Sequence, residues 1–483
     1  MTLDTTGTVR SLDSQSTTEA IGHKSSTTQP LGEKTPSRYE RAFHQLVDAI
    51  GEQVSAQAQT YFTATLAGES SQFTRFNSAK IRQTGQVQDG QLRLTLMTCD
   101  RTTSTNIPFV GDFTADWAIT QPALAVLRQE LPQLPTDPYV VIPSQTDQVS
   151  TREIHSGKIL PAEAIAQTLL TPVQASDFSG LYASGLSYRG YADSTGKHHW
   201  FETPSFTLDY SLFGQQPNQA VKGTFAGQHW DSVQYNRNIA ATEQKLVSMN
   251  RPIKSIPRGA YRTYLAPAAV GDIIDTMMWG GLGESALQQS NSAFNKLAEG
   301  KAQLSEKFSL QENFQRIKRP RFNRNGDIAP AELPIIHKGR WANALVSRRS
   351  AKEYGKPSNA ASAEEAMRAP TVSPGTLKQA DILAELGTGL YLSNLHYLNW
   401  SDLTAGRITG MTRYACFWVE NGEIVAPIEN LRFDDDLYRF LGEGLIDLTE
   451  QQTFLPAVGT YDRRSLGGMW MPGMLIDQFR YTL

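Results

Sequence analysis

The chain has 483 residues, a length that predicts about two to three domains. Its 45 Lys and Arg residues nearly balance its 48 Asp and Glu residues, and the net charge of -3 gives no global attraction to nucleic acid or to an anionic membrane. Apolar residues make up 40% of the chain, or about 48% with glycine included, which excludes a wholly disordered protein. The two cysteines, Cys99 and Cys416, are too few for a disulfide framework or a multi-thiolate zinc site.

The sequence contains neither a run of about 18 apolar residues, which a membrane span needs, nor an apolar segment of the secretory type near Met1. We therefore expect a cytoplasmic protein that binds neither membrane nor nucleic acid.

The amino-acid composition of the chain changes at about residue 38. Residues 1–37 are rich in Ser, Thr, Gly and Gln and are expected to be a disordered tail. Apolar residues at helical spacing then predict a helix from Arg38 to about Val54. Short strands are expected at 61–66, 73–76, 81–87 and 92–98, with Asp89-Gly90 as the hairpin turn between the last two. Helices are expected around 120–131 and 162–170, followed by antiparallel strands over 178–225.

The second part begins with a helix expected over 231–249, a strand over 261–265 and a helix that Pro267 opens. Residues 299–375 predict extended chain with a strand at 333–337. Further elements are expected in this order: a helix at 377–386, a strand at 390–399, a hairpin of 413–420 and 424–428 around Asn421-Gly422, a helix at 437–448 and a strand at 474–481. Asp434, Asp435 and Asp436 are interpreted as the N-cap and first turn of the helix at 437–448.

Interspersed helices and strands without a regular strand–helix–strand alternation predict an α+β fold. We expect an N-terminal helix and β-meander domain, then a larger, mixed and mainly antiparallel β-rich C-terminal domain. The expected segments are a tail at 1–37, an N-terminal domain at 38–225, a middle segment at 226–375 and a C-terminal β domain at 376–483.

Most motifs that carry chemistry are absent from the sequence. There is no phosphate-binding P-loop and no Gly-x-Ser-x-Gly nucleophile elbow, and Gly387-Thr-Gly389 lacks the third glycine of a dinucleotide site. Asp272 and Asp275 stand one helical turn apart, so they could share a cation or a proton, although a solvated helix face is the commoner meaning of such a pair. His396 could be a ligand or a base, but we favour a hydrogen-bonded packing histidine.

A basic cluster lies in the middle segment: Arg316, Lys318, Arg319, Arg321 and Arg324, with Arg348, Arg349 and Lys352 further on. An anion site is one interpretation of this cluster. Because aromatic residues are few nearby and the net charge is negative, we favour a solvated or inter-subunit surface.

Four C-terminal stretches resemble the TldD/PmbA family of metallopeptidase-related proteins, also known as the "modulator of DNA gyrase" family. They are Gly389–His396, Arg407–Arg413, Val419–Pro427 and Asn430–Phe433. Weaker similarity extends over most of the chain after the tail and includes Thr74–Asn77, Pro257–Tyr261, Leu265–Val270 and Ser347–Ser350.

In the zinc-bearing members of that family, the helix after Leu265–Val270 carries His-Glu-x-x-x-His, and a later cysteine completes the site. By this resemblance, the first histidine position is Asp275, the glutamate position is Thr276 and the second histidine position is Gly280. No cysteine follows Cys416, so the loop around Gly459–Ser465 supplies no thiolate. The chain therefore resembles the metal-free PmbA or TldE branch, with no catalytic residue, no cofactor and no metal ligand of its own.

The resemblance implies a non-catalytic subunit that pairs with a zinc-bearing TldD-type homologue, in a heterodimer or larger assembly that cleaves extended peptides. Two other hypotheses remain open. One is a hydrolase with a relocated site that uses Asp272, Asp275 or His396. The other is a stand-alone peptide-binding protein, as a monomer or homodimer.

Overall fold

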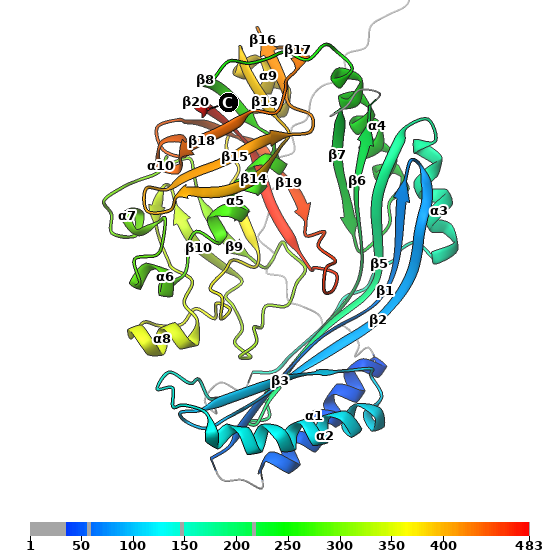
Figure 1. Ribbon diagram of the computed structural model, residues 1–483, viewed down its shortest axis with the longest axis vertical. Helices are drawn as coiled ribbons and strands as arrows, with labels where there is room; N and C mark the ends of the chain where they lie inside the picture. The colour runs from blue at the N-terminus through cyan, green and yellow to red at the C-terminus, as the bar shows by residue number, and fades with distance from the viewer. Residues whose placement is uncertain (1–34, 56–58, 145–148, 215–218, 483) are drawn as a thin grey trace, which may run out of the picture. The chain divides into compact units, whose positions relative to one another are not determined.

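The computed structural model describes residues 35–55, 59–144, 149–214 and 219–482. The tail expected at 1–37 lies almost wholly outside the described residues. The described chain has a helix and β-meander near its N-terminus and a larger, mixed, mainly antiparallel β-rich part after it, which confirms the expected α+β fold (Figure 1). No helix of the described ranges is long and apolar enough to cross a membrane.

The first sheet has seven strands in the order β3-β2-β1-β5-β6-β4, with β7 also paired to β6. Its strands are β1 Tyr61–Asn77, β2 Lys80–Met97, β3 Thr102–Pro108, β4 Thr151–Ile154, β5 Asp177–Asp193, β6 His198–Phe213 and β7 Ala220–Gly227. All pairs are antiparallel except β4 with β6. The antiparallel strands expected over 178–225 are confirmed.

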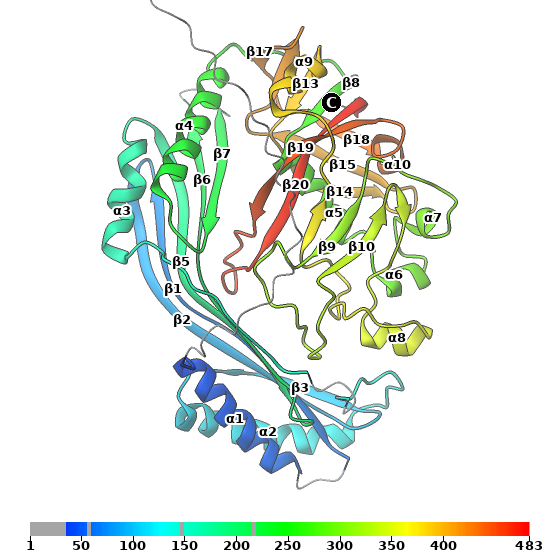
Figure 2. The same cartoon turned by 180° about the vertical axis from the view of Figure 1, so that it is seen from behind.

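Four helices and two short 3-10 turns accompany this sheet: α1 Arg38–Ser55, α2 Phe113–Glu130, η1 Leu131–Gln133, α3 Ala162–Leu170, η2 Thr171–Val173 and α4 Ser232–Met249. The strands β1, β5 and β6 are so long that each contributes to two separate clusters of buried side chains, whereas β2 contributes to the first alone. One cluster joins α1 and α2 to the sheet around Phe43 and Tyr188, and the other joins α3 and α4 around Tyr210 and Tyr235 (Figures 1 and 2).

The expected turn at Asp89-Gly90 is wrong. Both residues lie inside β2, where Gly90 pairs with Gly68 of β1. A Cβ at Gly68 would lie 2.3 Å from the Tyr188 ring, so the two glycines make room for that buried ring. The chain turns instead at Ser78 and Ala79, which both adopt a positive φ.

The second sheet has thirteen strands, with the central order β11-β10-β9-β12-β20-β8-β13-β16-β17. Its strands are β8 Gly259–Leu265, β9 Leu310–Asn313, β10 Glu332–His337, β11 Arg340–Trp341, β12 Pro370–Val372, β13 Gly389–Leu392, β14 Asn394–Asp402, β15 Arg407–Arg413, β16 Phe417–Glu420, β17 Glu423–Pro427, β18 Arg432–Asp436, β19 Leu445–Pro456 and β20 Gly468–Tyr481. The strand β20 pairs with β8, β12, β18 and β19, which makes it the centre of this sheet.

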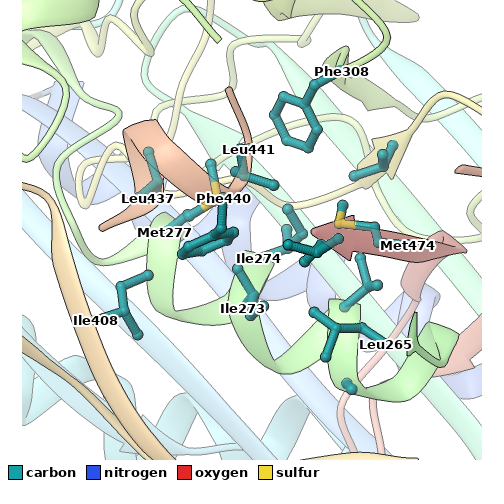
Figure 3. Packing of buried hydrophobic residues seen from close by; sticks show 14 of the residues in the cluster. Leu265, Ile273, Ile274, Met277, Phe308, Ile408, Leu437, Phe440, Leu441 and Met474 are labelled. Atoms are coloured by element: carbon teal, nitrogen blue, oxygen red, sulfur yellow. The ribbon is translucent and has the colours of Figure 1, made fainter. Parts of the chain in front are cut away.

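The remaining helices are α5 Pro267–Met278, α6 Glu284–Gln288, α7 Asn295–Ala298, α8 Arg348–Tyr354, η3 Gln379–Asp381, α9 Ile382–Leu386 and α10 Leu437–Phe440. The largest apolar core surrounds α5, whose Ile273, Ile274 and Met277 are fully buried against residues such as Leu437 and Phe440 (Figure 3). The apolar side of α5 is thereby fixed, and its other side is free to form a site.

Three expectations for the C-terminal part need correction. The helix expected over 437–448 ends at Phe440, and β19 begins at Leu445, because the chain reverses through Gly442 and Gly444. The helix expected over 377–386 is a 3-10 turn followed by the short α9. The strand expected over 390–399 is broken at Ser393 into β13 and β14.

The three acidic residues before α10 serve different purposes. Asp436 caps α10 by accepting a hydrogen bond from the Tyr438 N–H at 2.8 Å, as expected. Asp434 and Asp435 lie in β18 rather than in the helix, and they form ion pairs with Arg407 and Arg439. The boundaries expected at 225 and 375 remain predictions.

A candidate peptide-binding cavity

A cavity of about 680 Å³ opens beside α5, and we call it the central cavity. Its walls come from β7 and α4, from α5, from the start of β14 and from the hairpin of β19 and β20. Pro267 opens α5 without a side-chain cap, as expected for proline in the first turn. Because Ile273, Ile274 and Met277 fill the buried face of α5, the opposite face of the helix lines the cavity.

Asp272 and Asp275 both line the central cavity, as their one-turn spacing predicts. Asp272 accepts a hydrogen bond from the Leu395 N–H at 2.9 Å, and burial raises the pKa of Asp272 to about 7. Burial also raises the pKa of Asp275. Among the described residues, no hydrogen bond joins the two carboxyls, and the backbone N–H of Leu395 is the partner of Asp272.

Two lysines lie on the opposite wall, and sequence reasoning missed both. Lys222 projects from β7 and forms an ion pair with Asp209 at 3.2 Å. Lys245 lies at an exposed position of α4 on the cavity wall, and desolvation by the surrounding protein lowers its pKa. No motif marks these residues, because the pairing of β7 and the packing of α4 bring them to α5 from a distant part of the sequence.

The three motif positions do not fit a zinc ion. Asp275 offers one carboxylate, and the Thr276 hydroxyl is occupied by a hydrogen bond to the Asp272 carbonyl at 3.0 Å. Gly280 has no room for a side chain, since a Cβ there would lie 2.2 Å from Cζ2 of Trp400. Across the described residues there is no group of three or more His, Cys, Asp or Glu side chains that could hold a metal. A catalytic zinc needs about three protein ligands, and these three positions do not supply them.

Neither Cys416 nor His396 supplies a missing metal ligand. Cys416 is buried, its thiol donates to the Arg413 carbonyl at 3.2 Å, and burial raises its pKa to about 11. His396 is half-buried against Tyr397 and does not line the central cavity. Burial and the nearby Arg413 lower the His396 pKa, and its ring makes no hydrogen bond within the described part of the chain, unlike the hydrogen-bonded histidine expected.

The basic cluster of the middle segment does not form one surface. Arg324 pairs with Glu364, Arg348 with Asp327 and Arg349 with Asp137, while Arg316 lies over the Trp470 ring. Arg319 instead points inward and lines the central cavity.

The strand edges around the central cavity suit an extended ligand. Within the described sheets, β7 pairs only with β6, and Thr453–Pro456 of β19 pair only with β20. Both segments line the cavity. Each therefore has a second edge whose backbone groups can pair with an added strand, which is a common way to bind peptides.

Comparison with known proteins supports this interpretation of the fold. Residues 258–482 match the family model described as "PmbA/TldA metallopeptidase C-terminal domain". Among curated proteins there is no match.

Three solved structures have the same fold over nearly the whole chain. TldE from Thermococcus kodakarensis has a TM-score of 0.71 at 12% identity and covers 92% of this chain and 100% of its own. A protein from Thermotoga maritima, described as a modulator of a DNA gyrase, has a TM-score of 0.70 at 12% identity and covers 91% and 100%. A similarly described protein from Bacteroides thetaiotaomicron has a TM-score of 0.73 at 14% identity and covers 91% and 98%. At sequence identities of 12% to 14%, the structural similarity shows a shared fold.

Proposed function

The chain belongs to the metallopeptidase-related PmbA/TldD family through residues 258–482, and on that premise we propose that it is a non-catalytic, peptide-binding subunit of a peptidase. Its partner would be a zinc-bearing homologue of the TldD type, and the pair would act on extended peptides in the cytoplasm. The observation that carries the proposal is a central cavity with two available strand edges and, among the described residues, no set of metal ligands.

The cavity walls support binding more than catalysis. Backbone groups of β7 and β19 can pair with a peptide main chain, whereas Thr276 and Trp400 occupy the places that a general base and a second metal ligand would need. Asp272 is held by the Leu395 N–H and has no hydrogen bond to Asp275 among the described residues, which favours binding over a relocated hydrolase.

The first test is a pull-down of the tagged chain from its native cell, with identification of any protein recovered in near-equal amount. We expect a homologue that carries His-Glu-x-x-x-His. The isolated chain should contain much less than one equivalent of zinc and should not cleave peptides. Stoichiometric zinc together with peptidase activity in the isolated chain would overturn the proposal.

The second test addresses the central cavity. Ala268 lies on α5 and lines the cavity at a half-exposed position, so Ala268→Trp should fill the space without disturbing the core. We expect this variant to lose binding of a fluorescent extended peptide, measured by anisotropy with and without the partner. Ala241→Trp, at an exposed position of α4, is the matched control and should bind as the unaltered protein does. Equal binding by both variants would place the peptide elsewhere.

A further inference from the structure

A second cavity, of about 570 Å³, lies between the first sheet and the loops that follow β9 and precede β12. We call it the arginine cavity because six arginines line it: Arg93, Arg189, Arg319, Arg324, Arg368 and Arg463. Glu364 is the one acidic residue in the same lining among the described residues. A wall of this composition has a strong excess of positive charge.

Protein carboxylates compensate only part of this charge. Arg324 pairs with Glu364 at 3.3 Å, and the Arg463 Nε lies 2.7 Å from Asp89. The other four arginines have no ion pair with any described residue. The buried Glu312 lies near Arg368, but its two oxygens accept from the backbone N–H groups of residues 368 and 369, at 2.6 Å each.

Arg189 and Arg319 are the least compensated of the six. Arg189 donates through Nη1 to the carbonyls of Gly68 and Tyr188, which leaves its other N–H groups without a described protein acceptor. Arg319 donates to the Arg368 carbonyl, and its buried Nε has no partner among the described residues. Burial, reinforced by neighbouring arginines, lowers the pKa of both guanidinium groups to about 10.

Packing several guanidinium groups together costs free energy that an oxyanion would recover. The planar guanidinium fork matches a carboxylate with two parallel hydrogen bonds, and such charge-assisted bonds are about twice as strong as neutral ones. Since the repulsion is present without a ligand, the cavity is arranged for an anion before one arrives.

The two cavities share part of their walls. Arg319, Met367 and Arg368 line both the arginine cavity and the central cavity. A peptide strand that lies along β7 or β19 could therefore extend an acidic group past Met367 to these arginines.

We infer that the arginine cavity binds a carboxylate of an acidic peptide whose main chain lies in the central cavity. The carboxylate is a Glu or Asp side chain or the peptide's C-terminus. This inference rests on the peptide-binding function proposed above and adds the class of substrate to it. A free phosphate or dicarboxylate has the same chemistry, so the test must separate a small anion from a peptide.

The test uses the full chain with its partner, when one is recovered, and labelled extended peptides that carry one Glu at successive positions. Each peptide is compared with a version in which Gln replaces the Glu, and all of these peptides have an amidated C-terminus. One further pair of peptides differs only in whether the C-terminus is free or amidated. We expect at least one acidic peptide to bind about 10-fold or more tightly than its neutral counterpart. Arg189→Gln should abolish that difference, Arg189→Lys should restore part of it, and thermal unfolding should verify that both variants fold.

Arg82→Gln, at an exposed position of β2, removes the same charge outside the cavity and should keep the preference. If Arg189→Gln does not fold, Arg93→Gln at an exposed position of the cavity wall replaces it and should weaken the preference. Equal binding of acidic and neutral peptides would overturn this inference and leave the peptide-binding function standing. Failure of every peptide to bind would overturn both, and binding of inorganic phosphate alone would overturn the peptide assignment.

Discussion

At the scale of single residues, Gly280 shows why this chain cannot recover the metal motif by one substitution. The ring of Trp400 occupies the space that a side chain at residue 280 would need, because Cζ2 of that ring lies only 2.2 Å from where the Cβ would be. We expect Gly280→Ala to lower the free energy of unfolding by about 1–3 kcal/mol, the usual cost of overpacking a core. Chemical denaturation measures this change.

A matched control for Gly280→Ala is Gly85→Ala in β2, where no atom lies within 4 Å of the added Cβ. That variant should be neutral or slightly more stable, because alanine lowers the entropy of the unfolded chain. Trp400→Leu should restore part of the stability of Gly280→Ala. A Gly280→Ala variant as stable as the unaltered protein would show that Trp400 moves freely.

Asp272 should make stability depend on pH. Burial raises its pKa to about 7 in the folded protein, against 3.8 for an ordinary Asp. The folded state therefore holds a proton that the unfolded state has lost, and this contribution falls as pH rises from about 4 to 7. We expect Asp272→Asn, which keeps an acceptor for the Leu395 N–H, to be about 2 kcal/mol more stable at pH 8 and little changed at pH 4.

Urea denaturation at the two pH values checks the Asp272 prediction. Glu423→Gln removes the same charge at an exposed position of β17 and should show no such difference. Equal stabilisation of Asp272→Asn at both pH values would mean that the Asp272 carboxyl does not change its protonation over this range.

At the scale of elements, the hairpin of β1 and β2 allows a direct test of where the chain turns. Ser78 and Ala79 have φ values of 48° and 52°, which asparagine and glycine tolerate better than serine and alanine do. Ser78→Asn with Ala79→Gly should raise the free energy of unfolding by about 1 kcal/mol. Thermal unfolding measures the gain.

A substitution at Gly90 tests the same register from the other side, because a glycine in a strand responds differently to substitution from a glycine in a turn. Gly90→Ala should destabilise the protein by about 1–3 kcal/mol, since its Cβ would lie 2.4 Å from the Phe109 carbonyl inside the sheet. If Gly90→Ala were harmless and the double variant at 78 and 79 destabilising, the register of β1 and β2 would be wrong.

These elements also show what sequence can predict. Local signals were sufficient for α1, for the start of α5 at Pro267 and for the Asn421-Gly422 hairpin, where Asn421 and Gly422 adopt the positive φ values that such a turn requires. Sequence spacing also placed Asp272 and Asp275 on one wall. The sequence alone could not distinguish a turn from a strand at Asp89-Gly90. Residue 90 must be a glycine because the Tyr188 ring, which belongs to a strand far along the chain, packs close to it.

The arginine cavity could be predicted only in part, because Arg319 and Arg324 belong to the basic cluster of the middle segment, for which an anion site was one interpretation. Its walls combine Arg189 of β5 with Arg319 and Arg368 of two loops that meet only in the folded chain. Residues close in sequence, such as Arg316 and Arg319, instead have different environments. The cluster along the sequence therefore identified two of the six arginines, and the fold adds the other four from distant segments.

At the scale of the whole molecule, Arg464 joins the loop between β19 and β20 to the first sheet. Its guanidinium donates to the Ser205 carbonyl at 2.8 Å and to the Gly185 carbonyl at 3.2 Å, and its backbone N–H faces the buried Glu69 carboxylate. Arg464 is 2% exposed, and the Glu69 charge acts on its guanidinium as it does on that of Arg189, without a direct ion pair between Arg464 and Glu69 among the described residues. This loop position also brings the hairpin of β19 and β20 to the wall of the central cavity.

We expect Arg464→Ala to cost about 3 kcal/mol of stability, because the Ser205 and Gly185 carbonyls lose a charged hydrogen-bond donor and Glu69 loses one of its positive neighbours. Without the contacts of Arg464 to the first sheet, the loop at 457–467 should also be cleaved faster in limited proteolysis. Peptide binding should weaken, because the part of β19 that lines the central cavity is then held less firmly. Tyr461→Ala is the matched control, since Tyr461 lies fully exposed in the same loop and should change neither property. Unchanged proteolysis of Arg464→Ala with an unchanged unfolding midpoint would mean that β20 alone holds the hairpin, and the cavity wall would then be set by the second sheet without help from the first.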